Sequence, residues 1–237
     1  MNVTRFRARD ALLLVCCLLL PLAACSTGST TPLAASPTPI PTPTATPTPL
    51  VKAGTVLYQA NWSQGLDGWQ GSGWKSAQGQ LVTTGDGTFT IMAPYQPVVH
   101  SYAIEVQIQI TRLFRPVGGY FSIFAQSASG QDGFQAGVNR FMMPGPKPNG
   151  QHPQVQIRID PSSSMAQGDG LPRDYEPLTN WHTYRVEVQD TLASFFVDGS
   201  EVSSASTTVT PMLSTGPIGI TSSEAILTVK DFRIIAL

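Results

Sequence analysis

The sequence predicts an all-β domain built as a sandwich of two antiparallel sheets. Hydrophobic and polar residues alternate with a period of two along about eleven short segments, which is typical of half-buried strands. Turn dipeptides separate several of these segments, and hardly any stretch shows the 3.6-residue period of an amphipathic helix. Because each strand buries only one face, so many short strands in one domain favour two sheets packed against each other.

The clearest strand covers 101–110, with the sequence SYAIEVQIQI. Its even-numbered positions, from Tyr102 to Ile110, are all apolar and share one face, and the odd-numbered positions from Ala103 to Gln109 take the other. In chain order, similar patterns predict strands over 56–61, 80–84, 88–93, 101–110, 118–127, 133–141, 154–160, 182–189, 193–198, 217–221 and 226–235.

Glycine-containing dipeptides predict turns between these strands. They are Asp86-Gly87, Gly118-Gly119, Asp132-Gly133 and Asp198-Gly199. The segment 195–202, FFVDGSEV, predicts a tight hairpin, because Asp-Gly tolerates the positive φ that a two-residue hairpin turn requires.

The first 24 residues have the features of an export signal. Three arginines at positions 5, 7 and 9 precede an apolar run over 11–24, which is shorter than the ~20 residues that span a bilayer. The segment 22–25, LAAC, resembles the lipobox of bacterial lipoproteins. This resemblance implies cleavage before Cys25 and lipid attachment to its sulfur, which would anchor the protein to a membrane. An ordinary signal peptide with a coincidental cysteine is the alternative.

Residues 25–50 are predicted to form a lipidated cysteine and a linker. Seven prolines and eight threonines fall within 26–50. Proline fixes φ and lacks an N–H group, so this stretch should be extended polyproline II, reaching at most about 75 Å at ~3.1 Å per residue. The folded domain is therefore expected over 51–237.

Charge and cysteine content exclude several classes of function for that domain. The whole chain has a formal charge of −1, and without the three arginines and one aspartate of the first 24 residues the charge is −3. A nucleic-acid binder needs a basic surface, so no nucleic-acid partner is expected. All three cysteines, Cys16, Cys17 and Cys25, precede residue 51, which excludes disulfides and thiol nucleophiles in the domain.

Several motifs of the domain are together similar to one superfamily. They are GLDGW at 65–69, NWHTYRVEV at 180–188, FVDG at 196–199, GPIGI at 216–220 and VKDFRI at 229–234. Their order resembles the concanavalin A-like lectin/glucanase superfamily, in particular laminin-G modules and the 3-keto-disaccharide hydrolase domain. The resemblance implies a jelly roll with one convex and one concave sheet, whose ligands usually meet the concave sheet or its rim loops. Fold alone does not determine function.

A glycosidase site is not indicated. Such an enzyme needs two carboxyl groups flanking the scissile bond. Resemblance to the glucanase branch would imply a strand with acids at positions i, i+2 and i+4. At this spacing the best candidate strand of this chain has Glu105, Gln107 and Gln109. One acid cannot supply both groups, so Glu105 is interpreted as a lone acid on a solvated strand face. The serines and the three histidines show no spacing typical of a catalytic triad.

An amide-rich face is the main candidate site. Where residues such as Phe121, Ile123 and Val138 point to the core, the alternating polar residues point away from it. Amides and arginine are good partners for sugar hydroxyls, and an aromatic ring can stack under a sugar. The candidate ligand-binding residues are Tyr120, Gln126, Gln135, Asn139, Gln156 and Arg158. A merely solvated outer face is the alternative.

A structural calcium ion is the only cofactor that the sequence suggests. Calcium prefers carboxylate and carbonyl oxygens, and related sandwiches often hold one at a loop rim. The acidic loop 169–176 offers Asp169, Asp174 and Glu176, without the Asp-x-Asp-x-Asp-Gly spacing. A solvated loop is the alternative.

Together these observations predict an exported lipoprotein, facing the extracellular space or cell wall of a bacterium, whose sandwich domain binds a glycan without catalysis. A sugar-directed hydrolase, similar to the 3-keto-disaccharide hydrolase domain, is the second hypothesis. A structural or adhesive module that recognises protein through sheet edges and loops is the third.

Overall fold

The computed structural model describes residues 51–126, 133–143, 152–159, 166–168, 171, 175–178, 180–206 and 216–237. Within these ranges the chain forms fifteen β-strands and one short 3-10 helix, η1 (Trp62–Gln64). No helix there has the length and hydrophobicity that crossing a membrane requires. The predicted signal segment, Cys25 and the linker lie outside the described residues.

The larger sheet, called the β6 sheet below, has eight strands. Its order is β13-β12-β11-β6-β15-β4-β3, and β1 pairs with β15 beside this path. Its strands are β1 (Val56–Gln59), β3 (Trp74–Ala77), β4 (Gln80–Thr83), β6 (Ser101–Leu113), β11 (His182–Gln189), β12 (Leu192–Val197), β13 (Ser200–Ser206) and β15 (Ala225–Ala236). The last strand in the sequence, β15, lies inside the sheet and pairs with β6, β4 and β1.

The second sheet, called the β7 sheet below, has seven strands in the order β10-β9-β8-β7-β14-β5-β2. Its strands are β2 (Gln70–Gly71), β5 (Thr88–Met92), β7 (Val117–Gln126), β8 (Gly133–Met142), β9 (Gln154–Ile159), β10 (Ala166–Gly168) and β14 (Ile218–Ser223). All described strand pairs in both sheets are antiparallel. The predicted antiparallel sandwich is therefore confirmed.

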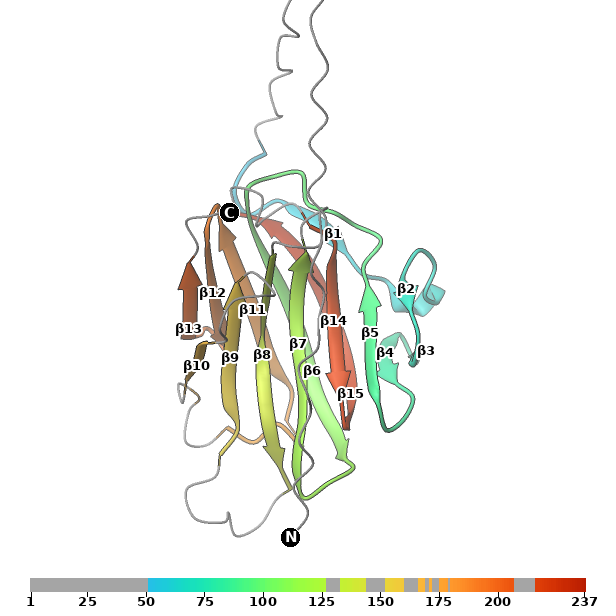
Figure 1. Cartoon of the computed structure of the whole chain (residues 1–237). Helices are drawn as coiled ribbons and strands as arrows, with labels where there is room; N and C mark the ends of the chain where they lie inside the picture. Colours follow the sequence, from blue (N-terminus) through green and yellow to red (C-terminus); the bar gives the residue numbers. More distant parts are fainter. Residues whose placement is uncertain are drawn as a thin grey trace, which may run out of the picture. The chain divides into compact units, whose positions relative to one another are not determined.

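The hydrophobic core lies between the two sheets, which face each other (Figure 1). On β6 the alternate positions from Tyr102 to Ile110 are at most 1% exposed, as the alternation predicted. Across the sandwich, the Phe121 ring of β7 meets the Tyr184 ring of β11 edge-on, with 4.6 Å between centroids. Among the described residues, the members of the core cluster run from Trp62 to Ile234.

The described strands match the predicted ones to within a few residues at each end. Four described strands lie outside the predicted ranges: β2, β3, β10 and β13, with two, four, three and seven residues. The first three are too short to show more than two cycles of alternation. The fourth, β13, contains four serines, and only its first three residues fall within the predicted hairpin 195–202. The predicted Asp-Gly hairpin joins β12 to β13, with Asp198 and Gly199 at φ values of 50° and 83°.

Candidate functional site

The outer face of the β7 sheet brings together residues that are far apart in the sequence. Antiparallel pairing aligns its outward-facing positions in rows that cross β9, β8, β7, β14 and β5. The first row is Arg158, Gln135, Phe124, Gly219 and Met92; the second is Gln156, Gly137, Ser122, Thr221 and Thr90; the third is Gln154, Asn139, Tyr120, Ser223 and Thr88. We call eight of these residues, Thr90, Ser122, Phe124, Gln135, Asn139, Gln156, Arg158 and Thr221, the platform.

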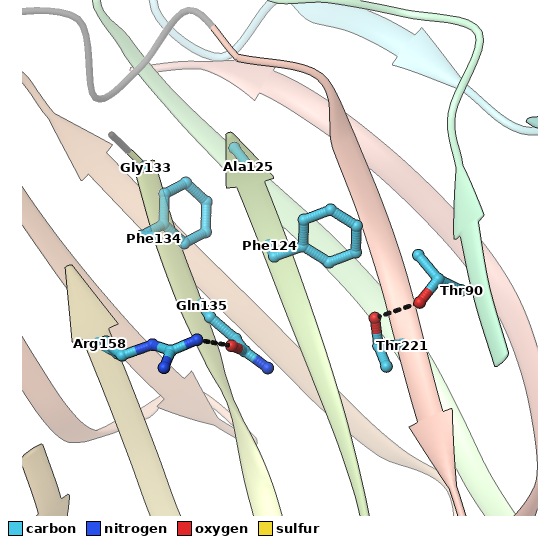
Figure 2. A pocket seen from close by; sticks show the side chains of 8 residues that line it. All are labelled: Thr90, Phe124, Ala125, Gly133, Phe134, Gln135, Arg158 and Thr221. Carbon is cyan, nitrogen blue, oxygen red and sulfur yellow. Dashed lines mark hydrogen bonds between the residues drawn. The ribbon is translucent and has the colours of Figure 1, made fainter. Parts of the chain in front are cut away.

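A shallow pocket opens on the platform. Its volume is about 150 Å³, and its lining is Thr90, Phe124, Ala125, Gly133, Phe134, Gln135, Arg158 and Thr221. In Figure 2 the Phe124 ring lies between Gln135 on one side and the Thr90–Thr221 pair on the other. The pocket thus combines an aromatic surface with amide, hydroxyl and guanidinium groups.

Hydrogen bonds between neighbouring strands hold the polar side chains of the platform in place. Arg158 Nη2 donates to Gln135 Oε1 at 2.9 Å, and Gln135 Nε2 donates to Ser122 Oγ at 2.7 Å. The Thr90 and Thr221 hydroxyl oxygens are 2.9 Å apart, which is a hydrogen bond (Figure 2). Among the described residues, these bonds leave one N–H group of Gln135 Nε2 and the second N–H group of Arg158 Nη2 without an acceptor.

Two glycines allow close approaches on this face, and one of them lies under the aromatic ring. A Cβ atom at Gly219 would lie 2.5 Å from Phe124 Cζ and 2.5 Å from the Ile91 carbonyl oxygen, so the Phe124 ring covers the glycine. A Cβ atom at Gly137 would lie 2.0 Å from the Phe121 carbonyl oxygen. Since the ring rests on Gly219, Phe124 is only 7% exposed although it points away from the core.

The charge of this sheet is unusual. Its seven described strands contain no aspartate or glutamate and only two basic residues, Arg140 and Arg158. The strands of the β6 sheet, by contrast, contain four acidic and five basic residues: Glu105, Glu187, Glu201, Asp231, Lys75, Arg112, Arg185, Lys230 and Arg233. The platform therefore offers hydrogen-bond donors and acceptors without a carboxylate.

The structure brings most of the predicted ligand-binding residues to this one face. Gln135 and Arg158 line the pocket, and beside it Asn139 Nδ2 donates to Gln156 Oε1 at 3.0 Å. Tyr120 lies opposite Asn139 and is half-buried. Gln126 lies at the end of β7, and its side chain is outside the described residues.

Six of the eight pocket residues are not among the predicted candidates, and three of them, Phe124, Thr90 and Thr221, contribute an aromatic ring and two hydroxyls. Phe124 alternates with the core residues Ile123 and Ala125, which places it on the outer face. The two threonines come from strands that were not considered for the face, although both alternate with core residues, Ile91 and Ile220. That alternation indicates that both threonines point away from the core. No local sequence signal indicates that β5 pairs with β14, because 131 residues separate Thr90 from Thr221.

Most of the predicted calcium loop is outside the described residues. This applies to Asp169 and Asp174. Glu176 is half-buried, and its carbonyl oxygen lies 3.3 Å from His182 Nε2. In the part of the chain that is described, no three His, Cys, Asp or Glu side chains are grouped as metal ligands.

Glu105 differs from the predicted lone acid on a solvated face. Its side chain is 18% exposed on the outer face of the β6 sheet and accepts hydrogen bonds from Arg185 Nη1, at 3.1 Å, and from Arg233 Nη2. Burial raises the pKa of Glu105, but the hydrogen bonds and charges of Arg233 and Arg185 outweigh burial, and the pKa falls below its ordinary value. The carboxylate is thus ionised at neutral pH and unsuited to donate a proton. The sequence missed these partners because they are 80 and 128 residues away.

A second polar cluster lies at the end of β11. His182 Nδ1 is 2.7 Å from Asp198 Oδ2, and Asp198 Oδ1 accepts the backbone N–H of Thr183 at 2.9 Å. The other ring nitrogen, Nε2, faces the Glu176 carbonyl oxygen. Each ring nitrogen of His182 therefore has an oxygen within hydrogen-bond distance. The imidazole joins the β12–β13 hairpin to the segment around residue 176 and is not open to a substrate.

The fold is similar to known structures, whereas sequence comparisons find no relative. No protein-family model matches the chain, and no curated protein matches it. A galectin-like protein of unknown function from Bacillus subtilis has 16% identity and a TM-score of 0.59, covering 78% of this chain and 97% of its own. The carbohydrate-binding module CBM66 from Bacillus subtilis has 15% identity and a TM-score of 0.53, covering 72% and 97%.

An enzyme shares the same architecture. The catalytic domain of an endo-1,3-β-glucanase from Thermotoga petrophila has 9% identity and a TM-score of 0.54, covering 78% of this chain and 98% of its own. At these identities the likeness establishes the fold. The two sheets form a jelly-roll sandwich similar to those of these structures.

Proposed function

We propose that this protein binds a glycan through the platform on the β7 sheet, without catalysing a reaction on it. One observation carries the proposal: a pocket lined by an aromatic ring, an amide, a guanidinium and two hydroxyls, on a sheet whose described strands contain no carboxyl group. Binding sites of this kind combine an apolar surface with a few placed polar groups that fix orientation.

The chemistry of the platform fits a sugar. A sugar ring has an apolar face of C–H groups, which can lie on the Phe124 ring, and a rim of hydroxyl groups, which can exchange hydrogen bonds with Gln135, Thr90 and Thr221. The hydrogen bonds from Arg158 to Gln135 and from Gln135 to Ser122 hold these groups before a ligand arrives, which lowers the entropy lost on binding. A carbohydrate-binding module among the similar structures supports the proposal.

A hydrolase is the second hypothesis, and the acid residues argue against it. Hydrolysis of a glycosidic bond needs a pair of carboxyl groups, one of them able to donate a proton. The β7 sheet has no such group in its described strands, and Glu105 is held ionised between two arginines on the opposite sheet. No observation favours the third hypothesis, a structural or adhesive module, over glycan binding.

We further infer that the domain is displayed outside a bacterial membrane by a lipid on Cys25, with the Pro/Thr segment as a stalk. The lipobox-like LAAC sequence supports this. Replacing Cys25 with serine should move the protein from the membrane fraction to the soluble or secreted fraction on immunoblots. Equal membrane association of both forms would contradict the anchor.

Binding is tested with the full chain, solubilised in mild detergent, against a panel of insoluble and immobilised polysaccharides. We expect selective retention that Arg158→Ala abolishes while the melting temperature stays within a few degrees. Glu201→Gln, an exposed change on the opposite sheet, is the matched control and should bind like the wild type. Repeating the assay with calcium and with a chelator tests the proposed calcium ion. Failure of a cooperatively melting protein to bind any polysaccharide would contradict glycan binding.

A further inference from the structure

The guanidinium of Arg158 has an unsatisfied hydrogen-bond donor. Its Nη2 carries two N–H groups, of which Gln135 Oε1 accepts one at 2.9 Å. The neighbouring Nε is buried and has no hydrogen-bond partner. Buried donors in folded proteins are nearly always paired, so this orphan requires an explanation. Nε and Nη2 form one edge of the planar guanidinium. Because Nε is closed to solvent, an anionic oxygen would reach the second N–H group of Nη2 and compensate the charge of that edge.

The positive charge of Arg158 is also uncompensated among the described residues. None of the acidic side chains that the structure describes forms an ion pair with it. On the β6 sheet, by contrast, Arg185 and Arg233 both form ion pairs with Glu105. Among the described residues, the partly buried arginines of the β6 sheet are paired, whereas Arg158, beside the pocket, has no ion-pair partner. Partly buried charges usually have a partner, and an anionic ligand in the pocket would supply one.

The size of the pocket sets how much of a ligand it holds. Its volume of about 150 Å³ is below the ~300–1,000 Å³ of sites that enclose a drug-sized ligand. It therefore suits one sugar residue and its substituent, with the rest of a chain lying across the sheet. Arg158 lies on the side of the pocket opposite the Thr90–Thr221 pair, with Phe124 between them (Figure 2).

We propose that the platform recognises an acidic glycan, with Arg158 binding the anionic group of a sugar residue whose ring lies on Phe124. This inference rests on the proposed glycan binding and names its ligand class. A carboxylate, as in a uronic acid, would accept from the second N–H of Nη2, in a charge-assisted hydrogen bond that is stronger than a neutral one. A sulfate or phosphate ester offers the same anionic oxygens. No acidic side chain on the described strands of this sheet would repel either group.

The test compares polysaccharides that differ only in charge. The probes are polygalacturonate and its fully methyl-esterified form, and dextran sulfate and dextran, with the full chain in mild detergent. Wild type should bind at least one acidic form about tenfold more tightly than its neutral partner. This ratio should fall with added salt, because salt screens exposed charge pairs. Arg158→Gln should bring the ratio to about one, and Arg158→Lys should retain part of it.

Arg140 provides the matched control. It is the other arginine of the sheet; it is exposed, and its Nη1 donates to Gln154 Oε1 at 3.3 Å. Arg140→Gln should keep the preference for the acidic form, with an unchanged melting temperature for both variants. Preference for polygalacturonate assigns a carboxylate, and preference for dextran sulfate alone assigns a sulfate or phosphate ester. Both support the inference.

Three results would overturn it. They are equal binding of acidic and neutral partners, an unchanged ratio in Arg158→Gln, and no binding to any of the four probes by a protein that melts cooperatively. If the wider panel still shows Arg158-dependent binding of neutral polysaccharides, glycan binding survives and only the acidic ligand is rejected. If that panel shows none, both fail.

Discussion

Glu105 joins three strands of the β6 sheet through its side chain. The carboxylate of β6 accepts from Arg185 of β11 and Arg233 of β15, and Arg185 Nε also donates to Glu187 Oε1 at 2.7 Å. Hydrogen bonds to charged groups contribute more than neutral ones, and these are only partly exposed to solvent. A residue that sequence analysis considered for catalysis therefore contributes to stability.

Replacement of Glu105 with glutamine should destabilise the domain in a pH-dependent way. We expect a loss of about 1–3 kcal/mol in the free energy of unfolding at pH 7. Because the pKa of Glu105 is lowered in the folded state, its contribution is present above the ordinary glutamate pKa and is lost as the pH falls below it. Urea unfolding at about pH 7, 5 and 3 should show the two proteins converging in acid. Exposed Glu201→Gln is the control; a constant difference at all pH values would contradict the prediction.

Three buried tyrosines should make the domain sensitive to alkali. Burial raises the pKa of Tyr102, Tyr175 and Tyr184 far above 10, and the last two share a hydroxyl hydrogen bond of 2.6 Å. Since the pKa values of these tyrosines are raised in the folded state, their hydroxyl groups stabilise the fold at pH values below the ordinary tyrosine pKa. This stabilisation is lost as the pH rises above the ordinary tyrosine pKa. Tyrosinate absorbance at about pH 11 should therefore report fewer ionised tyrosines in the folded protein than in urea. Equal absorbance in a protein that remains folded would contradict this.

At the scale of elements, two glycines are required for different physical reasons. Gly199, in the β12–β13 turn, has φ +83° and open space where a Cβ atom would lie. Gly199→Ala should cost about 1–2 kcal/mol, the energy of placing a Cβ atom in a left-handed conformation. Chemical unfolding measures this loss. Glycan binding should be unchanged, because the turn belongs to the other sheet.

Gly219→Ala should act through space instead of backbone conformation. The new Cβ atom would collide with the Ile91 carbonyl oxygen and with the Phe124 ring, so β14 or the ring must move. We expect a loss of about 1–3 kcal/mol, typical of overpacking, together with weaker glycan binding. Comparing both variants in the same unfolding and binding assays separates the effects. Wild-type binding in Gly219→Ala would show that the ring position does not matter.

The elements were more predictable than the contacts between them. Strong alternation predicted strands such as β6 and β11, and Asp198-Gly199 predicted a hairpin, because both signals are local in sequence. The pocket depends on which strands are neighbours and on their register, as where Gly219 lies opposite Phe124. Such pairings join distant segments and follow from packing of the whole sandwich. For that reason the candidate face was predictable, whereas its pocket, and the partners of Glu105, were not.

At the scale of the whole molecule, the two outer faces differ in chemistry. On the β6 sheet Glu105, Glu187, Arg185 and Arg233 form ion pairs with one another, whereas the β7 sheet presents neutral polar groups, an aromatic ring and an arginine whose described partner is an uncharged amide. A protein that uses one face for binding and the other for stability would show this division. Variants that weaken binding without affecting folding should therefore lie on the β7 sheet.

The domain should fold without the first 50 residues. Among the described residues its core cluster runs from Trp62 to Ile234, and these residues belong to one compact unit. We expect the segment 51–237 to have the same melting temperature as the segment 26–237, within experimental error, in differential scanning calorimetry. A clearly lower value for the shorter segment would show that residues 26–50 stabilise the domain.

The position of β15 has a consequence for how the protein is made. This strand follows all the other described strands in the sequence, yet it lies inside the β6 sheet between β6 and the strands β4 and β1. A ribosome releases β15 after all the other described strands, so the earlier strands lack their central partner until β15 has been made. The β6 sheet of a nascent chain would stay incomplete for that time. Chains truncated before residue 225 would have no route to the native sheet and would be left to proteolysis.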